Sequence, residues 1–144
     1  MKFIEETGLA QKLALLNYEI TSYINGLLPF PHINSSNYFY LLRLLDHPEI
    51  TQRDFSFVLK LNQSSITRAI NALMNHGYIE KIPSSDKRSA LLRLTALGEE
   101  TALGIKERID KLNETLQVSE AIPMLDAIQA NMNRLANSED KQDH

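Results

Sequence analysis

One stretch of the chain combines polar side chains at helical spacing with an apolar face behind them. A helix that begins at Gln63 would have an outer face made of Ser64, Arg68, Asn71 and Asn75. Its opposite face would consist of Ile66, Ile70 and Leu73, which recur at i, i+4 and i+7. The polar face carries hydroxyls, carboxamides and one guanidinium, but no carboxylate. Because Arg and Asn have the geometry for paired hydrogen bonds to guanine and adenine, this face suits duplex DNA.

A predicted hairpin follows directly. The segments Tyr78–Ile82 and Ala90–Leu94 are rich in strand-forming residues, and the turn between them carries the cations Lys87 and Arg88. Those two side chains would meet phosphates or the adjacent minor groove. We interpret Asp86 as a turn residue that positions Arg88, because a carboxylate that faced phosphates would repel them. A polar helix face beside a basic hairpin tip is typical of a winged helix-turn-helix.

The boundaries of these elements can be located from capping residues. Asn62 is placed to accept from the first N–H groups of the helix at Gln63, and Gly77 suits a left-handed end. Thr51 with Asp54 resembles a capping pair for a preceding helix, which would pack on the first through Phe55. The candidate DNA contacts are therefore Gln63, Ser64, Ser65, Thr67, Arg68, Asn71, Lys87 and Arg88.

Long amphipathic segments flank this core. One apolar stripe runs from Leu9 to Leu27 and ends at the prolines after it. A second helix is expected to start after Ser35 or Ser36 and to run through Leu45. After the hairpin, Thr95 would cap one long helix and Ser119 another. The fold class is thus mainly α with a small β-hairpin wing (α+β). We expect a single domain over 1–144, with a winged core at about 34–95, terminal helices at about 7–28 and 96–136, and a polar tail at 137–144.

The ordered set of motifs resembles the MarR family of winged helix-turn-helix regulators. The matching segments are Ser65-Ile66-Thr67-Arg68, His76-Gly77-Tyr78-Ile79, Asp86-x-Arg88-Ser89 and Leu94-Thr95-x-x-Gly98. Lys60 departs from the pattern, because the family often has Gly before the recognition helix. The resemblance implies a homodimer built from the first and the last two helices. It also implies a small-molecule effector bound between those helices and the winged core. Candidates to line that pocket are Tyr18, Tyr23, Phe30, His32, Tyr38 and Arg43, although core packing is the alternative for most of them.

Charge and composition exclude several other classes. The net charge is −3, but residues 51–95 carry seven Lys or Arg against three Asp or Glu, a local net charge of +4. Phosphate contacts are local, so this basic segment matters more than the total. There is no cysteine, no histidine pair at metal-ligand spacing, and no Gly-rich phosphate loop or nucleophile constellation, so we expect no metal, no cofactor and no enzymatic activity. With no signal-like start and no long apolar run, we expect a cytoplasmic protein.

These observations predict a sequence-specific, DNA-binding transcriptional regulator. It would bind a palindromic operator as a homodimer and act as a repressor that a small molecule releases. The alternative is a winged-helix module that binds proteins without sequence-specific DNA binding. An apolar outer face on the recognition helix would favour that alternative, and this face is polar.

Overall fold

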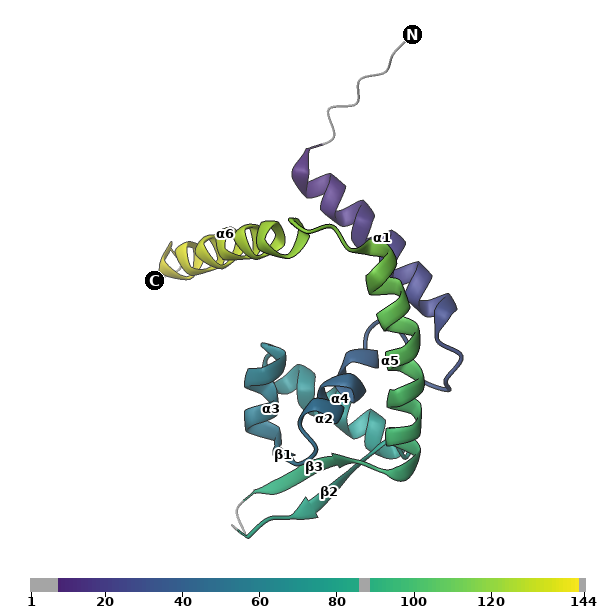
Figure 1. Cartoon of the computed structure of the whole chain (residues 1–144). Helices are drawn as coiled ribbons and strands as arrows, with labels where there is room; N and C mark the ends of the chain where they lie inside the picture. Colours follow the sequence, from purple (N-terminus) through teal and green to yellow (C-terminus); the bar gives the residue numbers. More distant parts are fainter. Residues whose placement is uncertain (1–7, 86–88, 143–144) are drawn as a thin grey trace. The chain divides into compact units, whose positions relative to one another are not determined.

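The computed structural model describes residues 8–85 and 89–142 and contains helices with a small antiparallel sheet (Figure 1). The elements in chain order are α1 (Leu9–Leu27), α2 (Tyr38–Asp46), β1 (Ile50–Thr51), α3 (Gln52–Leu59), α4 (Gln63–Asn75), β2 (Ile79–Pro83), β3 (Ala90–Leu94), α5 (Ala96–Leu116) and α6 (Ala121–Gln142). The predicted class, mainly α with a β-hairpin wing, is confirmed.

Local capping sets where the helices of the core begin and end. Thr51 accepts from Asp54 N–H at 3.1 Å at the start of α3, and Asn62 accepts from Ser65 N–H at 2.8 Å at the start of α4. Gly77, after α4, has a φ of +83°, as predicted for a left-handed end. Lys60, after α3, has a φ of +56°, a conformation that favours Gly. The sequence thus departs from the family pattern at a position where the backbone still adopts the geometry that suits glycine.

The sheet has the strand order β1-β3-β2, with both pairings antiparallel. In the hairpin, Ile79 pairs with Leu94 and Pro83 pairs with Ala90. The first hairpin strand therefore begins one residue later than predicted. Strand β1, which pairs with β3, was not predicted, because two residues are too short to produce an alternating pattern.

The core lies where α2, α3 and α4 meet the sheet and the first half of α5. Its fully buried side chains are Phe55, Leu41, Leu44, Ile66, Ile70, Leu73, Leu92 and Ile105. The whole apolar face predicted for the recognition helix is among them. Burying an aliphatic or Phe side chain stabilises the fold by about 1.5–3 kcal/mol, so this cluster fixes the position of α4.

Two compact units divide the chain, residues 1–109 and residues 110–144. The second unit contains the end of α5 and the helix α6, with Pro123 in the first turn of α6. That helix begins at Ala121, two residues after the expected cap at Ser119, with a turn in which Ala121 N–H donates to Val118 O. It continues to Gln142, into the segment expected as a tail, because no Gly or Pro interrupts the hydrogen-bond ladder there. None of the described helices combines the length and the apolar character that crossing a membrane requires.

Candidate nucleic-acid interface

The recognition helix α4 separates a buried face from an exposed one. Ile66, Ile70 and Leu73 are at most 1% exposed. The polar residues on the other side are all exposed: Gln63, Ser64, Ser65, Thr67, Arg68, Asn71 and Asn75. The structure therefore places every candidate contact of this helix at the surface, as the helical spacing predicted.

Hydrogen bonds within the chain orient some of the side chains on this face. Asn62 Oδ1 accepts from Ser64 Oγ at 2.8 Å as well as from Ser65 N–H. Thr67 Oγ1 accepts from Gln52 Nε2 at 2.7 Å, which joins α4 to the first residue of α3. Each of the two hydroxyl oxygens keeps further hydrogen-bonding capacity. These residues are therefore oriented by the fold and can still bind a phosphate or a base edge.

Arg68 is the cation on this helix, and its residue is exposed. Within the part of the chain that the structure describes, no hydrogen bond or ion pair joins its guanidinium to a carboxylate. Asn71 lies three residues further along, so the two side chains are neighbours on the helix surface. An Arg and an Asn at this spacing can address adjacent positions in a major groove.

The hairpin beside α4 is held at both ends of its described part. Arg93 Nε and Glu80 Oε1 form a cross-strand ion pair at 2.6 Å, and Ser84 Oγ donates to Ser89 O at 2.6 Å. The tip residues Asp86, Lys87 and Arg88 lie outside the described residues. The expected phosphate contacts of the two cations, and the positioning role of Asp86, therefore stay predictions.

Two cations outside the sequence-based set line a shallow hollow between the start of α3 and the hairpin. Arg53 and Lys81 are exposed there and share the hollow with Gln52 and Ser89. No carboxylate is among the described residues that line it. Both residues belong to the basic segment 51–95, but only the packing of α3 against the sheet brings them together. This hollow extends the basic surface from α4 toward the wing.

The six residues expected to line an effector pocket do not gather in one place. Tyr18 and Tyr23 are exposed on α1, and Tyr38 is half-buried with its ring edge-on to Phe39. Arg43 forms an exposed ion pair with Asp46 at 3.1 Å. Phe30 and His32 do line a common cavity, beside the end of α4. Among the described residues, no group of three or more His, Cys, Asp or Glu could hold a metal ion.

Comparisons with known proteins agree with this geometry. Residues 33–90 match the family model described as the MarR family. A stretch of 75 residues is 36% identical to the HTH-type transcriptional regulator BilQ of Clostridioides difficile (strain CD3), and the match spans about half (51%) of each chain.

Solved structures share the fold. The PcaV transcriptional regulator from Streptomyces coelicolor, in complex with its natural ligand, matches with a TM-score of 0.73 at 22% identity, over 92% of this chain and 98% of that one. A mutant of MarR from E. coli complexed with operator DNA matches with a TM-score of 0.70 at 20% identity, over 86% of this chain and 92% of that one. At these identities, the likeness is one of fold.

Proposed function

We propose that this chain is a MarR-family, sequence-specific, DNA-binding transcriptional regulator rather than an enzyme. It would act as a repressor in the cytoplasm, by covering a promoter. The observation that carries this proposal is the exposed polar face of α4, supported from behind by a fully buried apolar face and flanked by a basic hollow. A major groove admits a helix of this kind.

The proposed contacts divide into two classes. In this proposal the exposed residues Arg68 and Asn71 contact base edges, with Gln63, Ser64, Ser65 and Thr67 around them. In this proposal Arg53 and Lys81, which line the basic hollow, contact the phosphate backbone, and so do the predicted tip cations Lys87 and Arg88. Contacts of the first class specify the sequence. Contacts of the second class supply affinity that falls as salt rises.

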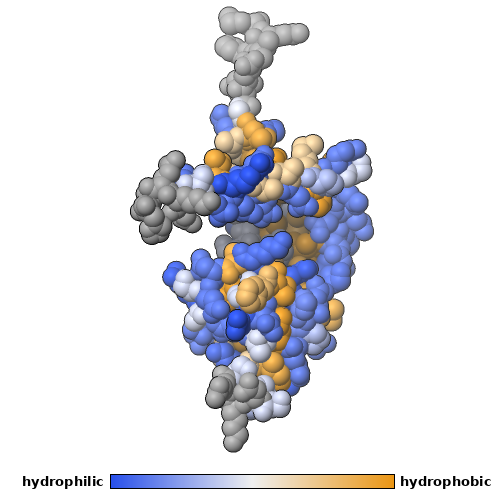
Figure 2. Space-filling model, turned by 90° about the vertical axis from the view of Figure 1, so that its left-hand side faces the viewer, coloured by the Kyte–Doolittle hydropathy of each residue, from blue (hydrophilic) through white to orange (hydrophobic). Residues whose placement is uncertain are grey.

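The terminal helices support a homodimer as the active form. Large apolar side chains are exposed on α1, including Leu9, Leu16 and Tyr23, and on α6, including Leu125, Met132 and Leu135. Apolar side chains also reach the surface as orange patches in Figure 2. A second copy of the chain would cover such stripes and would relate two recognition helices by a two-fold axis. The operator would then be an inverted repeat with half-site centres about 10 base pairs apart.

A small-molecule effector is the remaining part of the proposal. The crystal structure of PcaV, which shares this fold, is a complex with its natural ligand, and this chain has aromatic side chains beside the recognition helix. A ligand changes DNA binding only if its affinity differs between the DNA-binding conformation and another one. Binding of the ligand and release of the operator are therefore measured separately.

Selection of bound sequences from a random duplex pool tests the proposed function. We expect an inverted repeat to emerge, and we expect affinity for it to fall with salt along a steep logarithmic slope. A second selection from the same pool, performed with the Arg68→Ala variant, should show a weaker base preference at one position of each half-site, because that contact reads a base. Recovery of unrelated sequences, with equal affinity for all duplexes, would contradict sequence-specific regulation.

A further inference from the structure

We propose that the cavity between the α1–α2 loop and the end of the recognition helix is an effector site for a flat aromatic cation. The inference rests on the regulatory function proposed above, and it adds the place and the chemical class of the effector. The cavity measures about 450 Å³, within the range of small-molecule sites. Its walls come from three elements: the loop with Phe30 and His32, the end of α4 with His76 and Tyr78, and the start of α5 with Glu100.

Two stacked imidazoles form an aromatic wall of this cavity. The ring centroids of His32 and His76 lie 3.6 Å apart, and the ring planes differ by 8°. Both residues are exposed, so the pair presents a ring face that another flat ring can cover. His32 has a φ of +66°, a left-handed conformation that residues other than glycine rarely adopt. Such strained residues are concentrated at ligand-binding sites.

The loop that carries His32 is fastened on both sides. The Tyr78 hydroxyl donates to Pro31 O at 2.5 Å, and burial raises the pKa of Tyr78, so this phenol stays protonated as a donor. Phe30 packs directly on α5 at Gly104, where a Cβ would lie 2.8 Å from the ring, and Arg108 covers the ring at 5.2 Å. The loop is therefore held against both α5 and the segment that follows α4.

The charges around the cavity favour a cation. Among the described residues that line it, Glu100 is the carboxylate and there is no Lys or Arg; Arg108, which covers the Phe30 ring at 5.2 Å, is not part of the lining. His76 is the C-terminal capping residue of α4, and the carbonyl end of a helix carries partial negative charge. A ligand carboxylate would meet repulsion from both, whereas a cationic ring would stack on the histidines with its charge toward Glu100.

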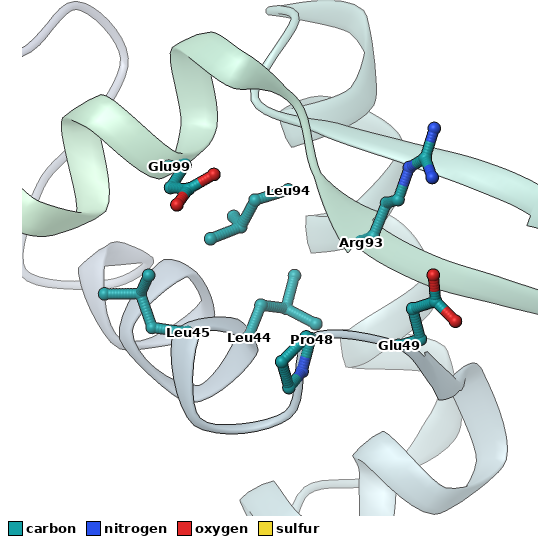
Figure 3. Close-up of a pocket in the computed structure, with 7 residues that line it drawn as sticks. All are labelled: Leu44, Leu45, Pro48, Glu49, Arg93, Leu94 and Glu99. Carbon is teal, nitrogen blue, oxygen red and sulfur yellow. The ribbon is translucent and has the colours of Figure 1, made fainter.

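The neighbouring carboxylate provides a matched control. Glu99, adjacent in sequence, lines a different pocket with Leu44, Leu45 and Leu94. Figure 3 shows its side chain projecting from α5 toward the leucines of α2. Neutralising Glu99 or Glu100 removes the same charge from the same turn of α5. The two variants thus separate an effect of this cavity from a general effect of net charge.

A ligand in the cavity would lie next to the end of the helix that carries the proposed DNA contacts. His76 directly follows the last residue of α4, and its N–H donates to Ala72 O inside that helix. A ring that stacks on His76 would contact the residue directly after α4, and any shift of His76 would pass into that helix through this hydrogen bond. Since α4 carries the proposed base contacts, the ligand-bound conformation would bind operator less tightly, which is the differential affinity that regulation requires.

Calorimetric titration of the full chain without DNA tests the site. The probes are N-methylquinolinium, its neutral isostere 1-methylnaphthalene, and the anion 1-naphthoate. We expect the cation to bind about tenfold more tightly than the anion, and Glu100→Gln to weaken cation binding about fivefold. Glu99→Gln should leave it unchanged. His32→Ala should weaken binding about two- to tenfold, and His32→Phe, which keeps a flat ring, should restore it.

The outcomes separate this inference from the function on which it rests. Equal binding of cation and anion, no binding of the cation, or a loss caused by Glu99→Gln instead of Glu100→Gln would overturn the site. Operator release is then followed by fluorescence anisotropy with a labelled duplex. Cation binding without release would overturn the regulatory role. A chain that binds the cation but no operator would instead contradict the proposed function and leave the site intact.

Discussion

The recognition helix and the last helix use similar amphipathic patterns but differ in what covers them. In α4 the apolar residues Ile66 and Ile70 are completely buried by the chain itself. In α6 the apolar residues Met132 and Leu135 are 59% and 58% exposed. The chain itself therefore covers the apolar face of α4, whereas α6 presents apolar surface that a partner would cover. In our proposal the first region binds DNA, and the second sets how many DNA-binding surfaces act together.

The largest expected effect comes from a charge in the proposed shared core. Leu135→Asp should disfavour dimerisation by several kcal/mol, because an unpaired buried carboxylate is costly. Sedimentation should report a monomer, and operator affinity should fall because the second half-site is lost. Asn137→Asp, which adds the same charge two residues further along α6, serves as the control. An unchanged dimer in the Leu135 variant would remove α6 from the interface.

The packing at the start of α5 and that at the end of α1 can be compared through one glycine in each helix. A Cβ at Gly98 in α5 would lie 1.9 Å from Tyr78 O, a backbone atom, whereas a Cβ at Gly26 in α1 would meet nothing within 4 Å. Gly98→Ala should lower the free energy of unfolding by about 3 kcal/mol or more. Gly26→Ala should raise it by about 0.5–1 kcal/mol, because alanine favours a helix. Urea unfolding at one fixed protein concentration measures both, and similar values would contradict the packed-versus-open contrast.

A smaller effect is expected on the polar face of α4. Arg68→Ala should weaken operator binding by about 1–3 kcal/mol if this guanidinium reads a base. Lys12→Ala, which removes an exposed cation from α1, should change affinity little. Anisotropy titrations at fixed salt, on operator and on random duplex, distinguish base reading from a phosphate contact. Equal weakening on both duplexes would assign Arg68 to the backbone instead.

The smallest effect concerns the turn between α3 and α4. Lys60 adopts a left-handed conformation, so Lys60→Gly should raise the free energy of unfolding by about 1 kcal/mol. Lys60→Ala removes the same charge but keeps the Cβ, and it should bring no such gain. Thermal unfolding of the three chains compares them. Equal stabilisation by Ala and Gly would show that charge, rather than backbone conformation, is responsible.

Local signals made the core of this fold predictable. The caps at Thr51 and Asn62, and the left-handed end at Gly77, depend on residues within a few positions of each other, and all three are present. The polar and apolar faces of α4 likewise follow from spacing alone. Strand β1 and the exact start of α6 did not follow, since the first is too short for a pattern and helix ends vary by a residue or two.

Sites formed by tertiary packing were harder to predict from the sequence. Arg53 and Lys81 are 28 positions apart and meet only because α3 packs beside the hairpin. Among the expected pocket residues, Phe30 and His32 share a cavity, whereas Tyr18 and Arg43 do not line it. The His32–His76 stack joins a loop to a helix end, and no spacing rule relates two such positions. Aromatic content indicated possible binding residues, but the fold decided which of them meet.

The most direct test of the account is the affinity of the wild-type chain for a full inverted repeat and for its isolated half-site, with sedimentation at the same micromolar concentration. We expect a dimer that binds the full repeat at least a hundredfold more tightly than the half-site, because the second recognition helix binds within an already formed complex. A monomer that binds both duplexes with equal affinity would contradict the proposal that a homodimer binds an inverted repeat.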